Sequence, residues 1–128
     1  AIGENEYTRW GFKQLIEANA AQVLNADAQV LGGITEWKKV ADLAMSSHVL
    51  LAPHGDQEIH AHLVASVPNG LIAEYYDNNT NALLKDMFPE PIRLNELGQI
   101  MVPQAPGLGV EIEYERIRPY CTYSSDDK

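Results

Sequence analysis

Short apolar runs alternate with amphipathic stretches over residues 1–76, which is the pattern of a repeating strand and helix unit. The continuous apolar run at 49–53 is typical of a parallel strand that is buried on both faces. Weaker apolar runs at 21–27 and 71–73 predict two further strands. Strands and helices that alternate at this spacing favour an α/β fold with right-handed crossovers and a parallel sheet.

Two of the amphipathic stretches predict helices that pack one face on the sheet. The first is expected at 8–19, with Thr8 as its N-cap. The second is expected after Thr35, with Glu36 in the first turn, where the helix dipole favours a negative charge. Apolar positions recur every three or four residues in this second helix and predict one buried stripe: Trp37, Val40, Ala41 and Ala44.

A third helix is expected at 57–67, with Asp56 as its N-cap and a Pro-Asn-Gly turn after it. Four positions form one stripe along this helix and are expected to face the core: Ile59, His62, Leu63 and Ser66. This pattern predicts that His62 packs inward and that His60 lies away from His62, nearer Val64 and Val67.

The character of the chain changes after residue 76. A polar loop at 77–80 is followed by a region that prolines interrupt repeatedly: Pro89, Pro91, Pro103, Pro106 and Pro119. We therefore expect two parts, a repeating strand and helix region at 1–76 and a tail at 77–128.

The tail is expected to be mostly β structure. Residues 92–94 and 99–102 flank a glycine-containing turn and predict a hairpin. Alternating apolar and polar residues at 110–114 predict a strand at an exposed edge, and 124–128 are expected to fray.

Composition and charge exclude several classes of protein. Of the 128 residues, 45% are apolar and 21% are charged, as in a folded globular chain. No apolar run reaches the roughly 18 residues of a membrane span. The net charge of −9 argues against a nucleic-acid partner, because phosphates need basic patches. The single Cys121 cannot form an internal disulfide, which favours a reducing, cytoplasmic location.

Four polar residues recur at equivalent points of the repeat, at or near the ends of apolar runs. They are Glu4, Asp27, His54 and Glu74, separated by 23, 27 and 20 residues. Each alone has an ordinary structural explanation, such as a turn residue or a charge at a strand end. Because successive parallel strands deliver their C-terminal ends to one rim, we expect the four side chains to meet there. Carboxylates and an imidazole at one rim could bind a divalent cation or move protons.

Several segments carry a family resemblance that depends on their joint order and spacing. They are residues 2–5, 25–37, 53–62, 71–75 and 106–110, which include Ile-Gly-Glu-Asn, Asn-Ala-Asp and Pro-His-Gly-Asp. Together they resemble the C-terminal half of the mandelate racemase and muconate lactonizing enzyme family of the enolase superfamily. The resemblance implies the C-terminal half of a TIM-type (β/α) barrel, about strands 5 to 8, followed by a tail that returns to a capping domain. A complete barrel needs roughly 250 residues, so this chain is expected to be about half of one.

The resemblance also implies a role for each of the four residues. Glu4 corresponds to the last of three carboxylates that hold one Mg²⁺. Asp27 and His54 correspond to a dyad in which His54 removes or delivers the proton beside the substrate carboxylate and Asp27 orients it. Glu74 corresponds to a residue that hydrogen-bonds that carboxylate as the enolate forms. The family often has proline before the dyad aspartate, where this chain has Ala26.

The implied activity is that of a dehydratase or a racemase acting on a hydroxy acid, most often a sugar acid. The other two metal carboxylates and a second base of the family would lie upstream of this chain. Alone it is therefore expected to bind Mg²⁺ weakly or not at all and to be inactive. We expect it to form a homo-oligomer or to pair with the missing N-terminal half.

Two alternatives remain open from the sequence. The chain could be a non-catalytic structural half-barrel that self-associates through its open strand edges. A cluster of polar residues could instead indicate a zinc hydrolase, although no HExxH spacing is present: His54, Asp56, Glu58, His60 and His62.

Overall fold

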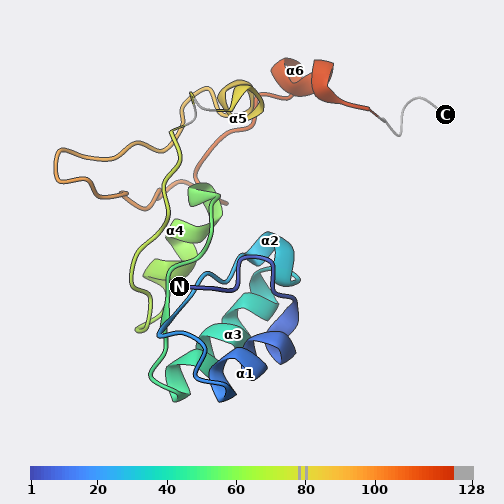
Figure 1. Cartoon of the computed structure of the whole chain (residues 1–128). Coiled ribbons are helices and arrows are strands. Elements are labelled where there is room, and N and C mark those ends of the chain that lie inside the picture. The colour runs from blue at the N-terminus through green and yellow to red at the C-terminus, as the bar shows by residue number, and fades with distance from the viewer. Residues whose placement is uncertain (78, 80, 123–128) are drawn as a thin grey trace. The chain divides into compact units, whose positions relative to one another are not determined.

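The computed structural model describes residues 1–77, 79 and 81–122. The chain divides into two compact units, Ala1–Tyr75 and Tyr76–Lys128 (Figure 1). The first unit contains the predicted strand and helix repeat.

Four parallel chain segments organise the first unit. Strands β1 (Val23–Leu24) and β2 (Leu50–Leu51) pair in parallel, with Val23 opposite Leu50 and Leu24 opposite Leu51. Single parallel bridges from Ile2 to Leu24 and from Leu51 to Gly70 extend this ladder on both sides. The four segments therefore lie side by side in chain order, and the predicted parallel arrangement is confirmed. The two strands are shorter than the predicted ranges of 21–27 and 49–53.

The prediction of a buried strand at 71–73 is wrong. The amide of Leu71 donates to the carbonyl oxygen of Leu51 at 2.8 Å, but no strand continues beyond this point. The side chains of Leu71 and Ile72 are 53% and 62% exposed. These side chains are exposed because residues 71–73 lie at the edge of the ladder. Within the described part of the chain, no further segment pairs with their outer side.

Helices α1 (Thr8–Glu17) and α3 (Ile34–Ser46) form close to the predicted places, and they pack against each other. Neither begins as predicted. Thr8 is the first residue of α1 instead of its N-cap, although its hydroxyl accepts a hydrogen bond from the amide of Trp10. Gly33 precedes α3 with a φ of 96°, a conformation that favours glycine, so α3 starts before Thr35.

Helix α2 (Ala28–Leu31) was not predicted, because four residues are too few to show a helical period. It ends at Gly32, whose φ of 117° is left-handed. Helix α4 (Gln57–Ala65) has Asp56 at its N-cap position, as expected. The Asp56 side chain makes no capping hydrogen bond, and the helix ends two residues before the predicted end at 67.

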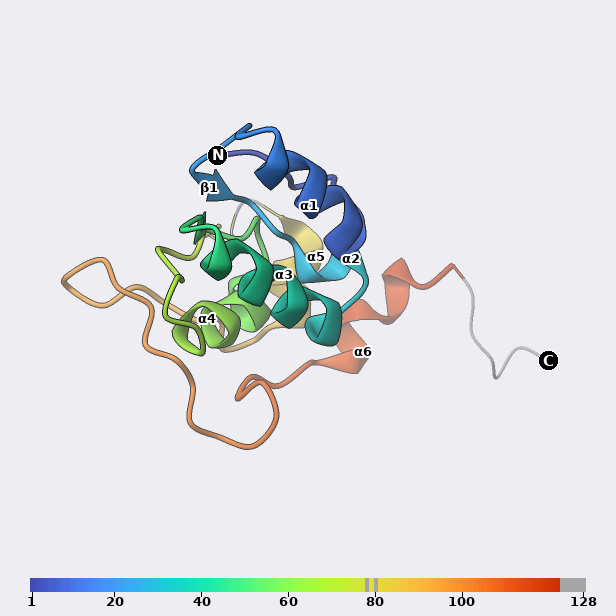
Figure 2. The ribbon, with the colours of Figure 1, turned by 90° about the horizontal axis from the view of Figure 1, so that it is seen from below.

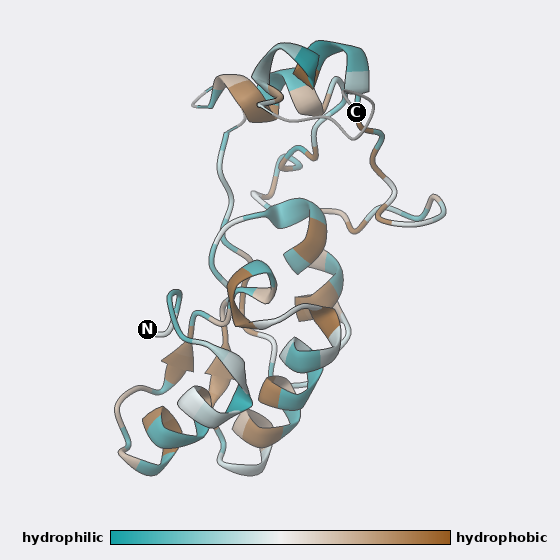
Figure 3. Cartoon of the chain, turned by 90° about the vertical axis from the view of Figure 1, so that its right-hand side faces the viewer, coloured by the Kyte–Doolittle hydropathy of each residue, from teal (hydrophilic) through white to brown (hydrophobic). Residues whose placement is uncertain are grey.

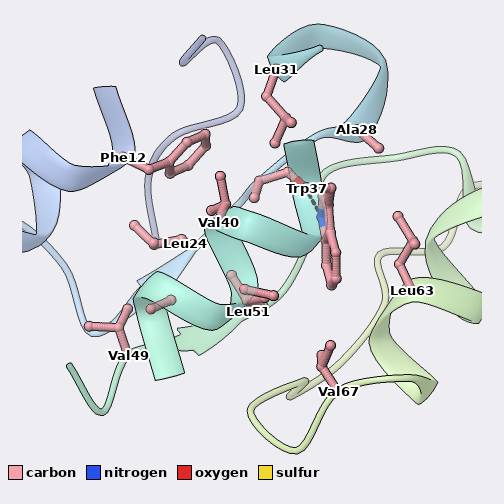
Figure 4. Packing of buried hydrophobic residues seen from close by; sticks show 13 residues of the cluster. Phe12, Leu24, Ala28, Leu31, Trp37, Val40, Val49, Leu51, Leu63 and Val67 are labelled. Atoms are coloured by element: carbon pink, nitrogen blue, oxygen red, sulfur yellow. Dashed lines mark hydrogen bonds between the residues drawn. The ribbon is translucent and has the colours of Figure 1, made fainter. Parts of the chain in front are cut away.

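The core of this unit fills the space between the parallel segments and the helices. Figure 4 shows the indole of Trp37 among the side chains of the cluster, between Val40 and Leu63. Trp37 is fully buried, and its Nε1 donates to the carbonyl oxygen of Ala26 at 2.8 Å. The predicted stripe of α3 is confirmed, since Trp37, Val40, Ala41 and Ala44 are all buried. Figure 3 shows that hydrophilic and hydrophobic residues both occur along each helix of this unit.

The second unit contains short helices, not the predicted β structure. Helices α5 (Ala82–Met87) and α6 (Tyr114–Ile117) contact each other, and a short 3₁₀ helix, Arg118–Tyr120, follows α6 (Figure 2). The predicted edge strand at 110–114 is wrong: within 110–113 no strand is assigned, and the amide of Glu113 donates to Met87.

The predicted hairpin is not confirmed. An antiparallel bridge joins Leu94 to Ile100, and Asn95 closes the turn between them, but the flanking residues form no regular strands. The residues 124–128 that were expected to fray lie outside the described residues. None of the described helices is long and apolar enough to cross a membrane.

The two tryptophans offer a test of this core. Trp37→Ala should lower the free energy of unfolding by about 3–5 kcal/mol, because it leaves a large cavity and removes the Ala26 hydrogen bond. Trp10, which is 62% exposed and stacks on Arg9, is the matched control. Trp10→Ala should cost about 1 kcal/mol or less. Urea unfolding followed by circular dichroism measures both, and equal losses would contradict the described core.

Candidate active site

The ladder brings polar residues to one end of the parallel segments. Each segment is followed, two to four residues after its bridging position, by one of the predicted site residues: Glu4, Asp27, His54 and Glu74. Because all four segments run in the same direction, these residues leave the ladder at the same rim.

Asp27 is fixed by the helix that it begins. It is the N-cap of α2, where its Oδ1 accepts a hydrogen bond from the amide of Gln29 at 2.8 Å. Its Oδ2 lies 3.2 Å from Nδ1 of His54. The Asp27 side chain is 6% exposed and the His54 side chain is 38% exposed. Asp27 is thus a buried hydrogen-bond partner of a partly exposed imidazole. A proton on Nδ1 of His54, the nitrogen beside Asp27, leaves Nε2 as the basic nitrogen of the neutral ring.

The surroundings of His54 favour its protonated form. Burial lowers the pKa of His54, but the hydrogen bond to Asp27 and the negative charges of Glu74, Glu4 and Asp27 together outweigh that effect. The net result is a pKa raised above the ordinary value of histidine. The charges of Glu74 and Glu4 therefore act on the same imidazole that Asp27 contacts.

Glu74 is held beside His54 through the backbone. Its Oε2 accepts a hydrogen bond from the amide of Gly55, the residue after His54, at 2.8 Å. Glu4 lies at an exposed position. The structure thus brings Asp27, His54 and Glu74 together by hydrogen bonds, whereas Glu4 acts on His54 through its charge alone.

Helix α4 carries a residue that sequence analysis placed wrongly. His60, not His62, is fully buried, and Gln57, Glu58, Ala61 and Leu63 are also buried. Nδ1 of His60 lies 2.7 Å from the carbonyl oxygen of Gly55, and Nε2 accepts from the amide of Ala28 at 3.0 Å. A polar ring can be buried here because both nitrogens have backbone partners. Apolar spacing on a helix does not reveal such partners.

Two acidic residues at the start of α4 are also affected by burial. Burial raises the pKa of Asp56, the charge of Asp27 adds to the effect, and Asp56 accepts a hydrogen bond from Gln29. Burial also raises the pKa of Glu58. The zinc alternative finds no support, since no group of three His, Cys, Asp or Glu side chains in the described ranges could hold a metal ion. Both nitrogens of His60 are also already engaged.

Comparisons of the sequence and of the structure with known proteins agree on one family. The model of the family described as enolase C-terminal domain-like matches residues 1–117. The chain is 32% identical over 124 residues to an L-rhamnonate dehydratase from Saccharopolyspora erythraea, covering 92% of this chain and 32% of that protein. It is 32% identical over 117 residues to a 3,6-anhydro-alpha-L-galactonate cycloisomerase from Streptomyces coelicolor, covering 91% of this chain and 31% of that protein.

A solved structure resembles the fold as well. The crystal structure of an L-talarate dehydratase from a Polaromonas species, complexed with Mg and L-glucarate, superimposes with a TM-score of 0.79 at 34% identity. The match covers 91% of this chain and 31% of that one. The chain therefore spans about a third of the length of the relatives that it matches.

The contact between Asp27 and His54 predicts a pH effect. Asp27→Asn should lower the pKa of His54, because a charged hydrogen-bond partner is lost. In the unsubstituted protein, the raised pKa stabilises the folded state below the unfolded pKa of about 6.5, and this contribution is lost as the pH rises through the folded pKa. NMR titration of the His54 imidazole measures the shift. Asp42→Asn, which removes an exposed partner of Lys38, is the control. An unchanged His54 titration in Asp27→Asn would contradict the pairing.

Proposed function

The chain belongs to the enolase C-terminal domain-like family, and we propose that it supplies the acid-base half of an acid-sugar dehydratase. As the sequence predicted, its relatives lie in the mandelate racemase and muconate lactonizing enzyme group. The proposed reaction removes the α-proton of a hydroxy acid and expels the β-hydroxyl as water.

One observation carries this proposal. A buried carboxylate, Asp27, contacts a partly exposed imidazole, His54, and the next residue along the chain, Gly55, holds Glu74 beside them. A partly exposed imidazole with a fixed tautomer is suited to general acid-base catalysis. The non-catalytic half-barrel alternative does not account for a carboxylate-paired, partly exposed histidine at the rim.

His54 has two roles in the proposed reaction. As the neutral base it takes the α-proton on Nε2, while the electrons of the C–H bond move toward the substrate carboxylate. As the acid it delivers a proton to the leaving β-hydroxyl, which departs as water when the C–C double bond forms. The resulting enol becomes a 2-keto acid by tautomerisation. The raised pKa of His54 keeps more of the acid form available near neutral pH.

Glu74 is proposed to bind the substrate carboxylate as negative charge builds on it. The amide of Gly55 fixes Oε2 as a hydrogen-bond acceptor. In the free protein Glu74 contributes negative charge at His54. In the proposed complex with an anionic substrate, its second oxygen, Oε1, would take up a proton and donate it in a hydrogen bond to the substrate carboxylate. Such a donor stabilises an enolate oxygen more than it stabilises the ground-state carboxylate.

Glu4 is the proposed metal ligand of this chain. A carboxylate oxygen is the type of ligand that Mg²⁺ prefers, and bound Mg²⁺ would stabilise negative charge on the substrate carboxylate. The described residues supply no group of three ligands, so this chain would contribute only part of such a metal site. We therefore propose that the remaining ligands come from another part of a longer protein, and that this chain alone is inactive.

Pairing with that other part would also cover apolar surface. Leu71 and Ile72 are exposed at one side of the parallel segments, and Ile2 is 38% exposed at the other. These side chains flank the open edges of the ladder, where a further parallel segment could pair. We propose that the N-terminal part of a complete barrel covers them.

Dehydration is preferred to the other reactions of the group because two of the three relatives above are named dehydratases. The cycloisomerase is also consistent with initial proton transfer at an acid sugar. The proposed substrates are therefore aldonic and aldaric acids, with L-rhamnonate, L-talarate and L-glucarate as probes.

The proton-transfer role is tested in the complete protein. His54→Asn should abolish exchange of the α-proton of the active acid with solvent deuterium, as followed by NMR, because asparagine has no basic nitrogen. His48→Asn is the control, since it removes an exposed histidine at the opposite end of β2 and its φ of 57° suits asparagine. Exchange that continues unchanged from both faces in His54→Asn would remove His54 from the mechanism.

The metal role of Glu4 is tested separately. Glu4→Gln should weaken Mg²⁺ binding to the complete protein by at least about 10-fold, measured by titration calorimetry, because a neutral amide replaces a charged ligand. Glu6→Gln, on the same loop, is the matched control and should bind Mg²⁺ as before. Equal affinity in Glu4→Gln and the unsubstituted protein would exclude Glu4 as a ligand.

A further inference from the structure

His60 joins the two loops that carry the acid-base pair. Its Nδ1 lies 2.7 Å from the carbonyl oxygen of Gly55, and its Nε2 accepts from the amide of Ala28 at 3.0 Å. Gly55 directly follows His54, and Ala28 directly follows Asp27. One imidazole therefore holds the backbone immediately after each member of the pair.

The two hydrogen bonds define the tautomer of the His60 imidazole. Since a carbonyl oxygen can only accept, Nδ1 carries a proton, and since an amide can only donate, Nε2 does not. The distance of 3.7 Å between Nε2 and Oδ1 of Asp27 is too long for a hydrogen bond. His60 thus acts on Asp27 through the backbone and not as an ion pair.

Burial protects this link. His60 is fully buried on α4, so water cannot replace the backbone partners of its ring. A second link joins the same loops at the surface, where Gln29 donates to Asp56. Gly55 is held from its other side as well, because its amide donates to Glu74.

We propose that His60 is a positioning residue that sets the separation and orientation of Asp27 and His54. The proposal deepens the proposed function and rests on it for its effect on rate. The effect on His54 itself does not depend on which reaction the protein catalyses. Small displacements of acid-base groups cost large factors in rate, so the link should be visible in kcat.

Three substitutions separate the two hydrogen bonds. His60→Leu removes both. His60→Gln places a carbonyl oxygen where Nε2 lies and keeps an acceptor for Ala28, while His60→Asn places an amide where Nδ1 lies and keeps a donor for Gly55. The complete protein with His60→Leu should lose about 10- to 100-fold in kcat, with a smaller change in KM. His60→Gln and His60→Asn should each recover part of that loss.

The pH titration of His54, followed by NMR without substrate, provides the second measurement. The charged groups that act on or lie near His54 are Asp27, Glu74, Glu4 and Asp56. If His60→Leu lets Asp27 move away, His54 should titrate at lower pH than in the unsubstituted protein. Val40→Ala, a core substitution on α3, is the control for lost stability. It should lower the melting temperature and leave the His54 titration unchanged.

The outcomes distinguish the two proposals. A His54 titration that is the same in His60→Leu and the unsubstituted protein would overturn the positioning role, whatever the activity. An equal shift in Val40→Ala would also overturn it, because the effect would then follow stability alone. A shifted titration in His60→Leu, together with α-proton exchange that survives in His54→Asn, would support positioning and reject the proposed function.

Discussion

The register of the parallel segments is the constraint on which the site depends. Leu24 lies opposite Leu51, and single bridges tie Ile2 and Gly70 to the same ladder. A shift of one residue along either strand would turn the side chains that follow it to the other face. The core reinforces this register because Leu24 and Leu51 are both fully buried. The hydrogen bonds between Asp27, His54, Gly55 and Glu74 are possible only in that alignment.

The site shares the negative charge of the whole chain. An overall charge of −9 opposes an anionic substrate, yet the negative groups around His54 stabilise its protonated form. The three carboxylates outnumber the single imidazolium, so the rim as a whole stays negative. Under the proposed function, a metal ion on Glu4 would supply the positive charge that an anionic substrate needs.

The sequence predicted what depends on local pattern and failed where distant contacts decide. Polar residues after apolar runs located Asp27 and His54 correctly at one rim, and the apolar period of α3 identified Trp37 as buried. The same reasoning assigned the buried position to His62 instead of His60, because the partners of His60 are backbone atoms 5 and 32 residues away. The segment at 71–73 was predicted to be buried from its apolar residues alone, but its outer side has no paired neighbour in the described chain. Alternation predicted a strand at 110–114, but residues 110–113 form none and α6 begins at Tyr114, since contact with α5 outweighs a weak local pattern.

Cross-strand NMR contacts test the central claim most directly. Nuclear Overhauser effects between backbone protons should connect Ile2 with Leu24, Leu24 with Leu51, and Leu51 with Gly70, in the parallel pattern. This result would place the four polar residues at one rim. A ladder shifted by one residue, or antiparallel contacts between these segments, would contradict the account, because His54 would then point away from Asp27.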